Sequence, residues 1–206
     1  NSAMKVSARV QCKDFPCTDT SRSSYLVPGV DLDPAKVSIL LIYEAAPANV
    51  EDYYYAGPEA LFARTTVLAF QDAGAKVESV KDILGLGVYL TTAVKCGKTG
   101  YGIATPTIQN CSFLLENEVA LFPNVKVFLL MGDVAIKAVN MIAKRNGEPR
   151  VIPAGATYRI RGGEFTFRGA RALPSYVQAG AAFFVEKVKR KMIAEDINKA
   201  LDLVSK

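Results

Sequence analysis

Val37-Ser-Ile-Leu-Leu-Ile-Tyr43 is a short apolar run rich in β-branched side chains, and such a run predicts a buried strand. Two similar runs follow, Val88-Tyr-Leu-Thr-Thr-Ala-Val94 and Val125-Lys-Val-Phe-Leu-Leu-Met131. The spacing of apolar residues predicts helices over Pro58 to Ala73, Thr105 to Leu121, Val134 to Lys144 and Ala181 to Val204, with Thr105 capping the second and Pro106 in its first turn. Gly162-Gly163, between Tyr158–Arg161 and Glu164–Arg168, predicts a β-hairpin with a two-residue turn.

The alternation of strands and helices indicates an α/β fold with a mostly parallel sheet. In such sheets ligands bind beyond the carboxyl ends of the strands, which groups Glu44, Thr92 and Pro174-Ser175-Tyr176 around one crevice. We find no internal repeat or linker, so we expect one domain over residues 4–206. Residues 1–3, which precede Met4, are interpreted as an expression-tag remnant.

The chain has 206 residues, a net charge of +5 and no histidine. The absence of histidine excludes serine–histidine and cysteine–histidine nucleophile pairs, imidazole bases and histidine metal sites. The basic balance favours a polyanionic partner. No apolar run reaches the ~18 residues of a membrane span, and charged residues near the amino terminus argue against a secretory signal. We expect a cytoplasmic protein that is a monomer and does not bind membranes.

Four cysteines are present, at Cys12, Cys17, Cys96 and Cys111, in a C-x4-C pair and a C-x14-C pair. Four thiolates form a complete ligand set for one iron–sulfur cluster or one structural zinc. Buried unliganded thiols and two disulfides are the alternatives, although disulfides are uncommon in a chain of intracellular character. The spacing by itself leaves these alternatives open.

The motifs around the cysteines resemble those of the iron–sulfur (family 4) uracil-DNA glycosylases. The similarity lies in Val88-Tyr-Leu-Thr-Thr-Ala-Val-Lys-Cys96, Thr105-Pro-Thr107, Cys111, Phe128-Leu-Leu-Met-Gly-Asp-Val-Ala135, Glu44-Ala-Ala-Pro47 and Leu173-Pro-Ser-Tyr176, in an order that covers nearly the whole chain. The chain departs from the family in its first cysteine pair, which is C-x2-C in the family. The resemblance implies a three-layer αβα sandwich with a central, mostly parallel four-stranded sheet.

The resemblance also implies a 4Fe–4S cluster bound by the four cysteines, with zinc as the alternative. Glu44 matches the family glutamate that positions or activates water, and Tyr55 is the residue that we expect to stack on the base. Thr92 stands where the family has a base-reading asparagine, and Leu173 stands where it has a histidine that stabilises the leaving base. Ser175, Tyr176 and Gln178 are the candidates to replace these lost hydrogen-bond donors.

DNA is the expected partner, with Arg168, Arg171 and Gln178 as the candidate contacts. The first hypothesis is a divergent DNA glycosylase that hydrolyses the N-glycosidic bond of uracil or another damaged base. The second is an iron–sulfur protein of the same fold that binds nucleic acid or a nucleobase without cleaving it. The third is a cluster-bearing protein whose substrate is unrelated to DNA.

Overall fold

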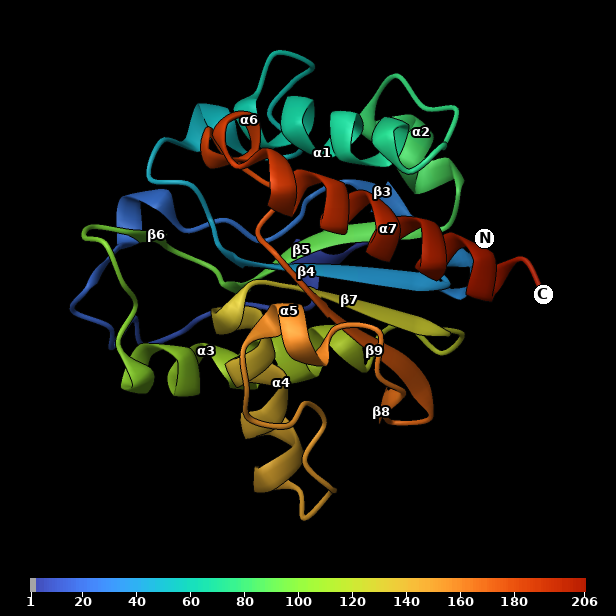
Figure 1. Ribbon diagram of the computed structural model, residues 1–206. Coiled ribbons are helices and arrows are strands. Elements are labelled where there is room, and N and C mark those ends of the chain that lie inside the picture. The colour runs from blue at the N-terminus through green and yellow to red at the C-terminus, as the bar shows by residue number, and fades with distance from the viewer. Residues whose placement is uncertain (1–2) are drawn as a thin grey trace.

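The computed structural model describes residues 3–206 and has a five-stranded sheet at its centre, in the strand order β5-β4-β7-β9-β8 (Figure 1). The strands are β4 (Ile39–Ala45), β5 (Val88–Val94), β7 (Val127–Met131), β8 (Phe165–Phe167) and β9 (Ala170–Ser175). The first four in spatial order are parallel, and β8 pairs antiparallel with β9 at the edge. The predicted α/β class and parallel sheet are therefore confirmed, with one extra edge strand.

Helices cover both faces of this sheet, which gives three layers (Figure 1). One face carries α3 (Thr105–Val119), α4 (Asp133–Arg145) and α5 (Thr157–Ile160), and the other carries α1 (Leu61–Asp72), α2 (Val80–Gly85), α6 (Ala182–Val185) and α7 (Lys187–Val204). Every residue of β5 and β7 is buried, as expected for strands covered on both sides.

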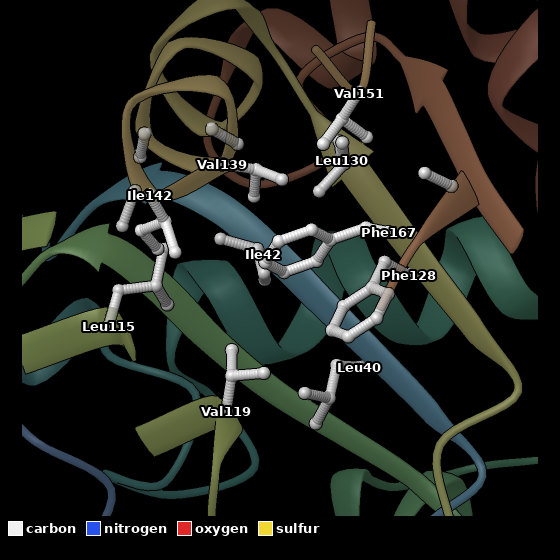
Figure 2. Close-up of a cluster of buried hydrophobic side chains, with 14 of the residues drawn as sticks. Leu40, Ile42, Leu115, Val119, Phe128, Leu130, Val139, Ile142, Val151 and Phe167 are labelled. Atoms are coloured by element: carbon white, nitrogen blue, oxygen red, sulfur yellow. The ribbon is translucent and has the colours of Figure 1, made fainter. Parts of the chain in front are cut away.

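Two apolar clusters fill the space between the layers. Figure 2 shows part of the first, which includes Leu40 and Ile42 of β4, Leu115 of α3 and Ile142 of α4. The second cluster lies on the opposite face, where alternate residues of the same strands pack against α1 and α7. Side chains of a strand point alternately to its two faces, so each central strand contributes to both cores.

The β-hairpin forms at a different place from the predicted one. Tyr158 and its neighbours lie in the short helix α5, and the turn that joins β8 to β9 is Arg168-Gly169. Both turn residues have positive φ, 51° and 83°, as a type I′ hairpin turn requires. The prediction of a hairpin at Gly162-Gly163 is wrong because the residues before it form a helix and not a strand, although the chain does turn at Arg161-Gly162.

The helix predictions hold in their centres and fail at two ends. Thr105 is the first residue of α3 and not its cap, since Ala104 occupies the cap position. The predicted carboxyl-terminal helix is broken at Glu186, whose ψ of 74° separates α6 from α7. The short helix α2 was not predicted. Within residues 3–206, no helix combines the length and apolarity needed to cross a membrane.

Several short elements lie outside the central sheet, most of them in the amino-terminal segment. These are β1 (Met4–Lys5), β2 (Thr20–Ser21), β3 (Asp31–Leu32) and β6 (Gly97–Lys98), with four single-turn 3-10 helices, η1 (Val6–Ala8), η2 (Arg22–Ser24), η3 (Pro34–Lys36) and η4 (Val50–Asp52). β1 pairs with β3, and β2 pairs with β6. The second pairing brings the segment after Cys17 against the residue that follows Cys96.

Candidate metal centre and adjoining cavity

All four cysteines line one cavity of about 400 Å³. Cys12 and Cys17 lie on the irregular segment between η1 and β2, Cys96 follows β5, and Cys111 lies in the second turn of α3. None of the four forms a disulfide. The two halves of the cysteine set, separated by 78 residues in the sequence, are therefore brought together by the fold.

The protonation of these thiols reflects burial and mutual proximity. Burial, and to a smaller extent the neighbouring thiols of Cys111, Cys12 and Cys17, raise the pKa of Cys96 to about 12. Burial likewise raises the pKa of Cys111, to about 11, although the backbone N–H of Lys95 donates to its sulfur at 3.2 Å and opposes the shift. A bound cation would reverse these preferences, because metal ligation requires the thiolate.

Aromatic and basic residues support the wall that carries Cys12 and Cys17. The backbone N–H of Cys12 donates to the hydroxyl of Tyr25 at 2.8 Å, and the ring of Tyr25 meets the edge of Phe15 with 5.0 Å between centroids. The guanidinium of Arg22 lies 4.1 Å from the centroid of the Phe15 ring. Phe15 has a positive φ of 45°, which an L-residue adopts only when its surroundings hold it there.

A fully buried ion pair lies behind this cavity. The ammonium of Lys95 donates to Glu118 Oε1 at 2.5 Å, and neither side chain is exposed to solvent. The same ammonium donates to the hydroxyl of Thr91 at 2.8 Å, and the hydroxyls of Tyr89 and Thr91 donate to Glu118 Oε2 at 2.6 and 2.7 Å. These bonds tie β5, immediately before Cys96, to the helix that carries Cys111.

The spacing of the sulfurs bears on what they could hold. Within the described part of the chain, no group of three or more histidine, cysteine, aspartate or glutamate side chains is arranged around a single ion position. A structural zinc needs its ligands at about 2.0–2.3 Å from one point. A four-iron cluster takes one thiolate on each iron, so its ligands stand farther apart around a larger cavity. The chain supplies the four thiolates that such a cluster requires, and all four line the cavity of about 400 Å³.

Glu44 lines a second cavity, of about 650 Å³, at the carboxyl end of β4. Tyr43, Asn49, Phe62, Lys98 and Tyr101 are among the other lining residues. With Asp52, which also lines it, the cavity therefore combines two carboxylates, one amide, one ammonium and several aromatic rings. We refer to it below as the Glu44 cavity.

The carboxyl group of Glu44 is held at the amino end of α4. The backbone N–H of Val134 donates to its Oε2 at 3.1 Å. Burial raises the pKa of Glu44, while this hydrogen bond and the nearby Lys98 act in the opposite direction. Gly132 leaves the necessary space, because a Cβ there would lie 2.8 Å from Glu44 Cγ and 2.7 Å from Val177 Cγ1.

Neither Tyr55 nor Thr92 lines the Glu44 cavity. The hydroxyl of Tyr55 donates to the carbonyl of Leu90 at 2.7 Å, so this ring covers the edge of β5 and borders a separate groove of about 1090 Å³ beside α1 and α2. Thr92 is fully buried and donates to the carbonyl of Val94 at 2.7 Å. The expectation that these two residues contact a base beside Glu44 does not agree with this arrangement.

The end of β9 approaches Glu44 with the backbone of Ser175, but the side chains of Leu173, Ser175 and Tyr176 lie elsewhere. The carbonyl of Ser175 accepts the N–H of Gly132 at 3.1 Å, next to Glu44. The Ser175 hydroxyl, however, donates to Asp196 of α7 at 2.5 Å. The Tyr176 ring lies 5.3 Å from the ammonium of Lys189 on the same helix. Leu173 is buried in the core beneath α7.

The candidate DNA contacts are also placed differently from the prediction. Gln178 is fully buried, and its amide donates to the hydroxyls of Tyr54 and Thr66 at 2.8 and 3.2 Å, so it cannot reach DNA in this structure. Arg168 forms ion pairs with Glu116 and Glu148, each at 3.1 Å.

Arg171 lies at the start of β9, beside the first residue of β7. Its Nε and Nη2 are buried and have no hydrogen-bond partner within residues 3–206. Because these strands are parallel, Arg168 and Arg171 lie at the sheet edge opposite to Glu44. A nucleic acid bound at the Glu44 cavity would therefore need other basic residues.

Sequence reasoning did not select Phe62 and Asn49, which line the Glu44 cavity. Phe62 lies on the predicted amphipathic helix, where its apolar character suited a core position. The Oδ1 atom of Asn49 accepts the N–H of Glu51 at 3.0 Å. Neither residue carries a local signal, because only the packing of α1 and of the loop after β4 brings them beside Glu44.

Comparison with protein-family models and with curated proteins finds no match to this chain.

Proposed function

We propose that this protein is a divergent DNA glycosylase with a 4Fe–4S cluster. The observation that carries the proposal is the pairing of two sites: four cysteines around one cavity and a half-buried carboxylate in a cavity beside it. The loop between Cys96 and Cys111 contributes to the walls of both. Zinc is the less favoured occupant, since the sulfurs are not gathered around one ion position in residues 3–206.

The cluster, when bound, would supply a covalent anchor between the amino-terminal segment, the end of β5 and α3, and a one-electron redox couple. All other steps concern side chains of the chain itself. A glycosylase takes the target nucleotide out of the base stack and into a pocket. The Glu44 cavity has room for a nucleobase, and the rings of Phe62 and Tyr43 lie edge to face in its wall, with centroids 5.2 Å apart.

Glu44 is suited to activate water in this cavity. Val134 holds one carboxylate oxygen, which leaves Oε1 for a water molecule. Because burial raises its pKa, Glu44 is a stronger base than an exposed glutamate. The water oxygen would attack the anomeric carbon, the water proton would pass to Glu44, and the electron pair of the broken C–N bond would leave with the base.

The departing base carries negative charge and needs hydrogen-bond donors. The Glu44 cavity offers the ammonium of Lys98 and the amide of Asn49 for this purpose. Losing one such donor typically lowers the rate about 10²–10³-fold. We expect Lys98→Met to lower the rate by this amount without changing the cofactor content.

The rival function is binding without cleavage, and one observation favours it. The two positions where the family that the sequence resembles carries its base-reading amide and its leaving-group imidazole cannot play those roles here. Thr92 donates its hydroxyl to its own strand, and Leu173 lies in the core. Such a protein would hold a nucleobase or a nucleic acid in the Glu44 cavity without hydrolysis.

Two measurements test these proposals. Anaerobic purification should give a brown protein with about four irons and four sulfides per chain. Replacement of Cys111 by serine should abolish the colour. A colourless anaerobic preparation with one zinc per chain would contradict the proposed cofactor.

The second measurement is abasic-site formation on oligonucleotides that contain uracil, hypoxanthine or another lesion. The expected result is cleavage that Glu44→Gln abolishes and Glu51→Gln leaves unchanged, since Glu51 is exposed and does not line the cavity. Salt-dependent binding without cleavage would support the rival function. Absence of both would remove nucleic acid as the partner.

A further inference from the structure

Three segments of the chain meet at Gly97, directly after Cys96. A Cβ at this position would lie 2.6 Å from the carbonyl oxygen of Pro47, 2.8 Å from Ala48 Cα and 2.9 Å from Ser24 Cβ. Two of these three atoms belong to the backbone, so the junction has no room for a side chain. Pro47 and Ala48 line the Glu44 cavity, so the residue next to a cysteine touches the wall of that cavity.

Hydrogen bonds join the same three segments. The hydroxyl of Ser24 donates to the carbonyl of Ala48 at 2.7 Å, and Ser24 is buried. Thr20 and Ser21, which follow Cys17, pair as β2 with Lys98 and Gly97 in β6. The amino-terminal cysteine segment is thus fastened to the residues after Cys96 on one side of the junction.

Asp19 forms hydrogen bonds to the connection between Cys96 and Cys111 on the other side of the junction. Its backbone carbonyl accepts the N–H of Thr99 at 3.2 Å and the hydroxyl of Thr99 at 3.1 Å. Its carboxylate accepts the N–H of Ala104 at 2.7 Å and the hydroxyl of Thr107. Ala104 occupies the cap position of α3 and has no capping side chain, so Asp19 supplies the cap from a distant part of the sequence. The hydrogen bond from Ala104 is the main reason that the pKa of Asp19 is lowered.

The connection between Cys96 and Cys111 therefore serves both cavities. Its two ends line the cysteine cavity, and Lys98, Thr99, Gly100, Tyr101 and Ile103 line the Glu44 cavity. Asp19 and Gly97 hold this connection at its two points of contact with other segments. A movement of the cysteine segment must shift the wall of the Glu44 cavity, because close-packed backbone leaves no space for independent adjustment.

We propose that Gly97 and Asp19 are positioning residues that couple the two cavities, so that the state of the cysteine centre sets the shape of the Glu44 cavity. The coupling does not depend on what the Glu44 cavity binds. It takes from the proposed function only that the cysteines hold a metal centre.

Hydrogen exchange measures the coupling without a ligand. The reporter amides are Thr99 and Ala104, which bond to Asp19, and Ala46, which bonds to the carbonyl of Val94 at 3.0 Å beside Glu44. We expect removal of the metal with a chelator to speed exchange at all three, while amides in β7 stay unchanged. For Ala104, whose acceptor is a carboxylate, loss of the hydrogen bond corresponds to about ten- to hundredfold faster exchange. For Thr99 and Ala46, whose acceptors are carbonyls, it corresponds to about two- to tenfold faster exchange. Equal exchange at the three amides in loaded and stripped protein would overturn the coupling.

Two pairs of variants separate coupling from general instability. Gly97→Ala should speed exchange at Ala46 and also speed alkylation of Cys96 in the stripped protein. The matched control is Gly102→Ala, since a Cβ at Gly102 would meet nothing within 4 Å. Asp19→Ala should speed exchange at Ala104, and Asp19→Asn, which keeps one acceptor oxygen, should restore part of the protection.

The variants also decide the matter if the protein takes up no metal. That outcome contradicts the proposed cofactor. The coupling is then tested in the unloaded chain, by comparing amide exchange beside Glu44 with alkylation of Cys96. A Gly97→Ala effect confined to one cavity would overturn it. If Gly97→Ala does not fold, the Asp19 pair provides the same comparison: Asp19→Ala must change both the amides beside Glu44 and the reactivity of Cys96, and a change in one alone refutes the proposal.

Discussion

The buried ion pair of Lys95 and Glu118 should be the most sensitive electrostatic point in the fold. Both side chains have no solvent exposure, so removal of one partner leaves the other charge in the interior. Breaking such a pair typically costs about 3–5 kcal/mol. The two single variants should differ within this range, because the partners that remain are different.

Lys95→Met leaves the carboxylate of Glu118 with two donors, the hydroxyls of Tyr89 and Thr91. We therefore expect a loss of about 3 kcal/mol in the free energy of unfolding, at the low end of the range. Glu118→Leu leaves the ammonium with neutral oxygens only and removes the acceptor of both hydroxyls. This variant should lose about 5 kcal/mol.

The double variant, Lys95→Met with Glu118→Leu, buries no charge. It should therefore be less destabilised than either single variant. Its free energy of unfolding should be about 2 kcal/mol below that of the unchanged protein, because two hydroxyls lose their acceptor. The assay is urea denaturation of the reduced, metal-free chain, which removes metal binding from the unfolding equilibrium. The control is the exposed pair of Lys5 and Asp31, whose side chains are 49% and 71% exposed, where Lys5→Met should change stability by under about 1 kcal/mol. Single losses near 1 kcal/mol, or losses that simply add in the double variant, would refute the reasoning.

Three further predictions concern the cavities. Gly132→Ala should lower the free energy of unfolding by about 2–4 kcal/mol, since its Cβ would meet Glu44 and Val177 and its φ is 104°. The control is Gly147→Ala, where φ is 69° and a Cβ would meet nothing within 4 Å; it should lower the same free energy by about 1–2 kcal/mol in the same denaturation assay. Because burial raises the pKa of Glu44, the stability that its protonated form contributes is full below the usual pKa near 4.5 and is lost as pH rises through the raised pKa. Glu44→Gln should therefore be more stable than the unchanged protein at about pH 7, and its free energy of unfolding should vary less from about pH 4 to pH 8. The same pH dependence in both proteins would contradict this. Removal of metal from the cysteine cavity should lower the midpoint of thermal unfolding by about 5–10 °C, measured by calorimetry with and without chelator, and the Cys17→Ser protein should show no such difference.

Much of the secondary structure could be predicted from the sequence because it depends on the local pattern of apolar residues. The apolar run Val37–Tyr43 contains most of β4, the run Val88–Val94 is β5, and the periodic segments around Leu61, Thr105 and Val134 are helices. The errors fall where one residue decides the geometry. Arg168 adopts a positive φ that its side chain does not favour, and Glu186 breaks a helix whose apolar spacing is continuous.

The candidate site was predicted less well, for a physical reason. A strand presents alternate residues to opposite faces of the sheet. Two residues at the carboxyl ends of strands can therefore direct their side chains to different places. Thr92 and Ser175 both lie at carboxyl ends of strands, as predicted, but their hydroxyls bond to Val94 and Asp196. Gln178 follows the same edge and is drawn into the core by Tyr54.

The chain alone determined the α/β class, the mostly parallel order and the number of thiols, since each follows from local periodicity or from composition. Only the tertiary structure decided that Cys12 and Cys17 meet Cys96 and Cys111 around one cavity, and that the connection between Cys96 and Cys111 also borders Glu44. Contacts between distant segments depend on which backbones can pack closely. Here the segments pack because Gly97 has no side chain, and because the carboxylate of Asp19 reaches the backbone N–H of Ala104.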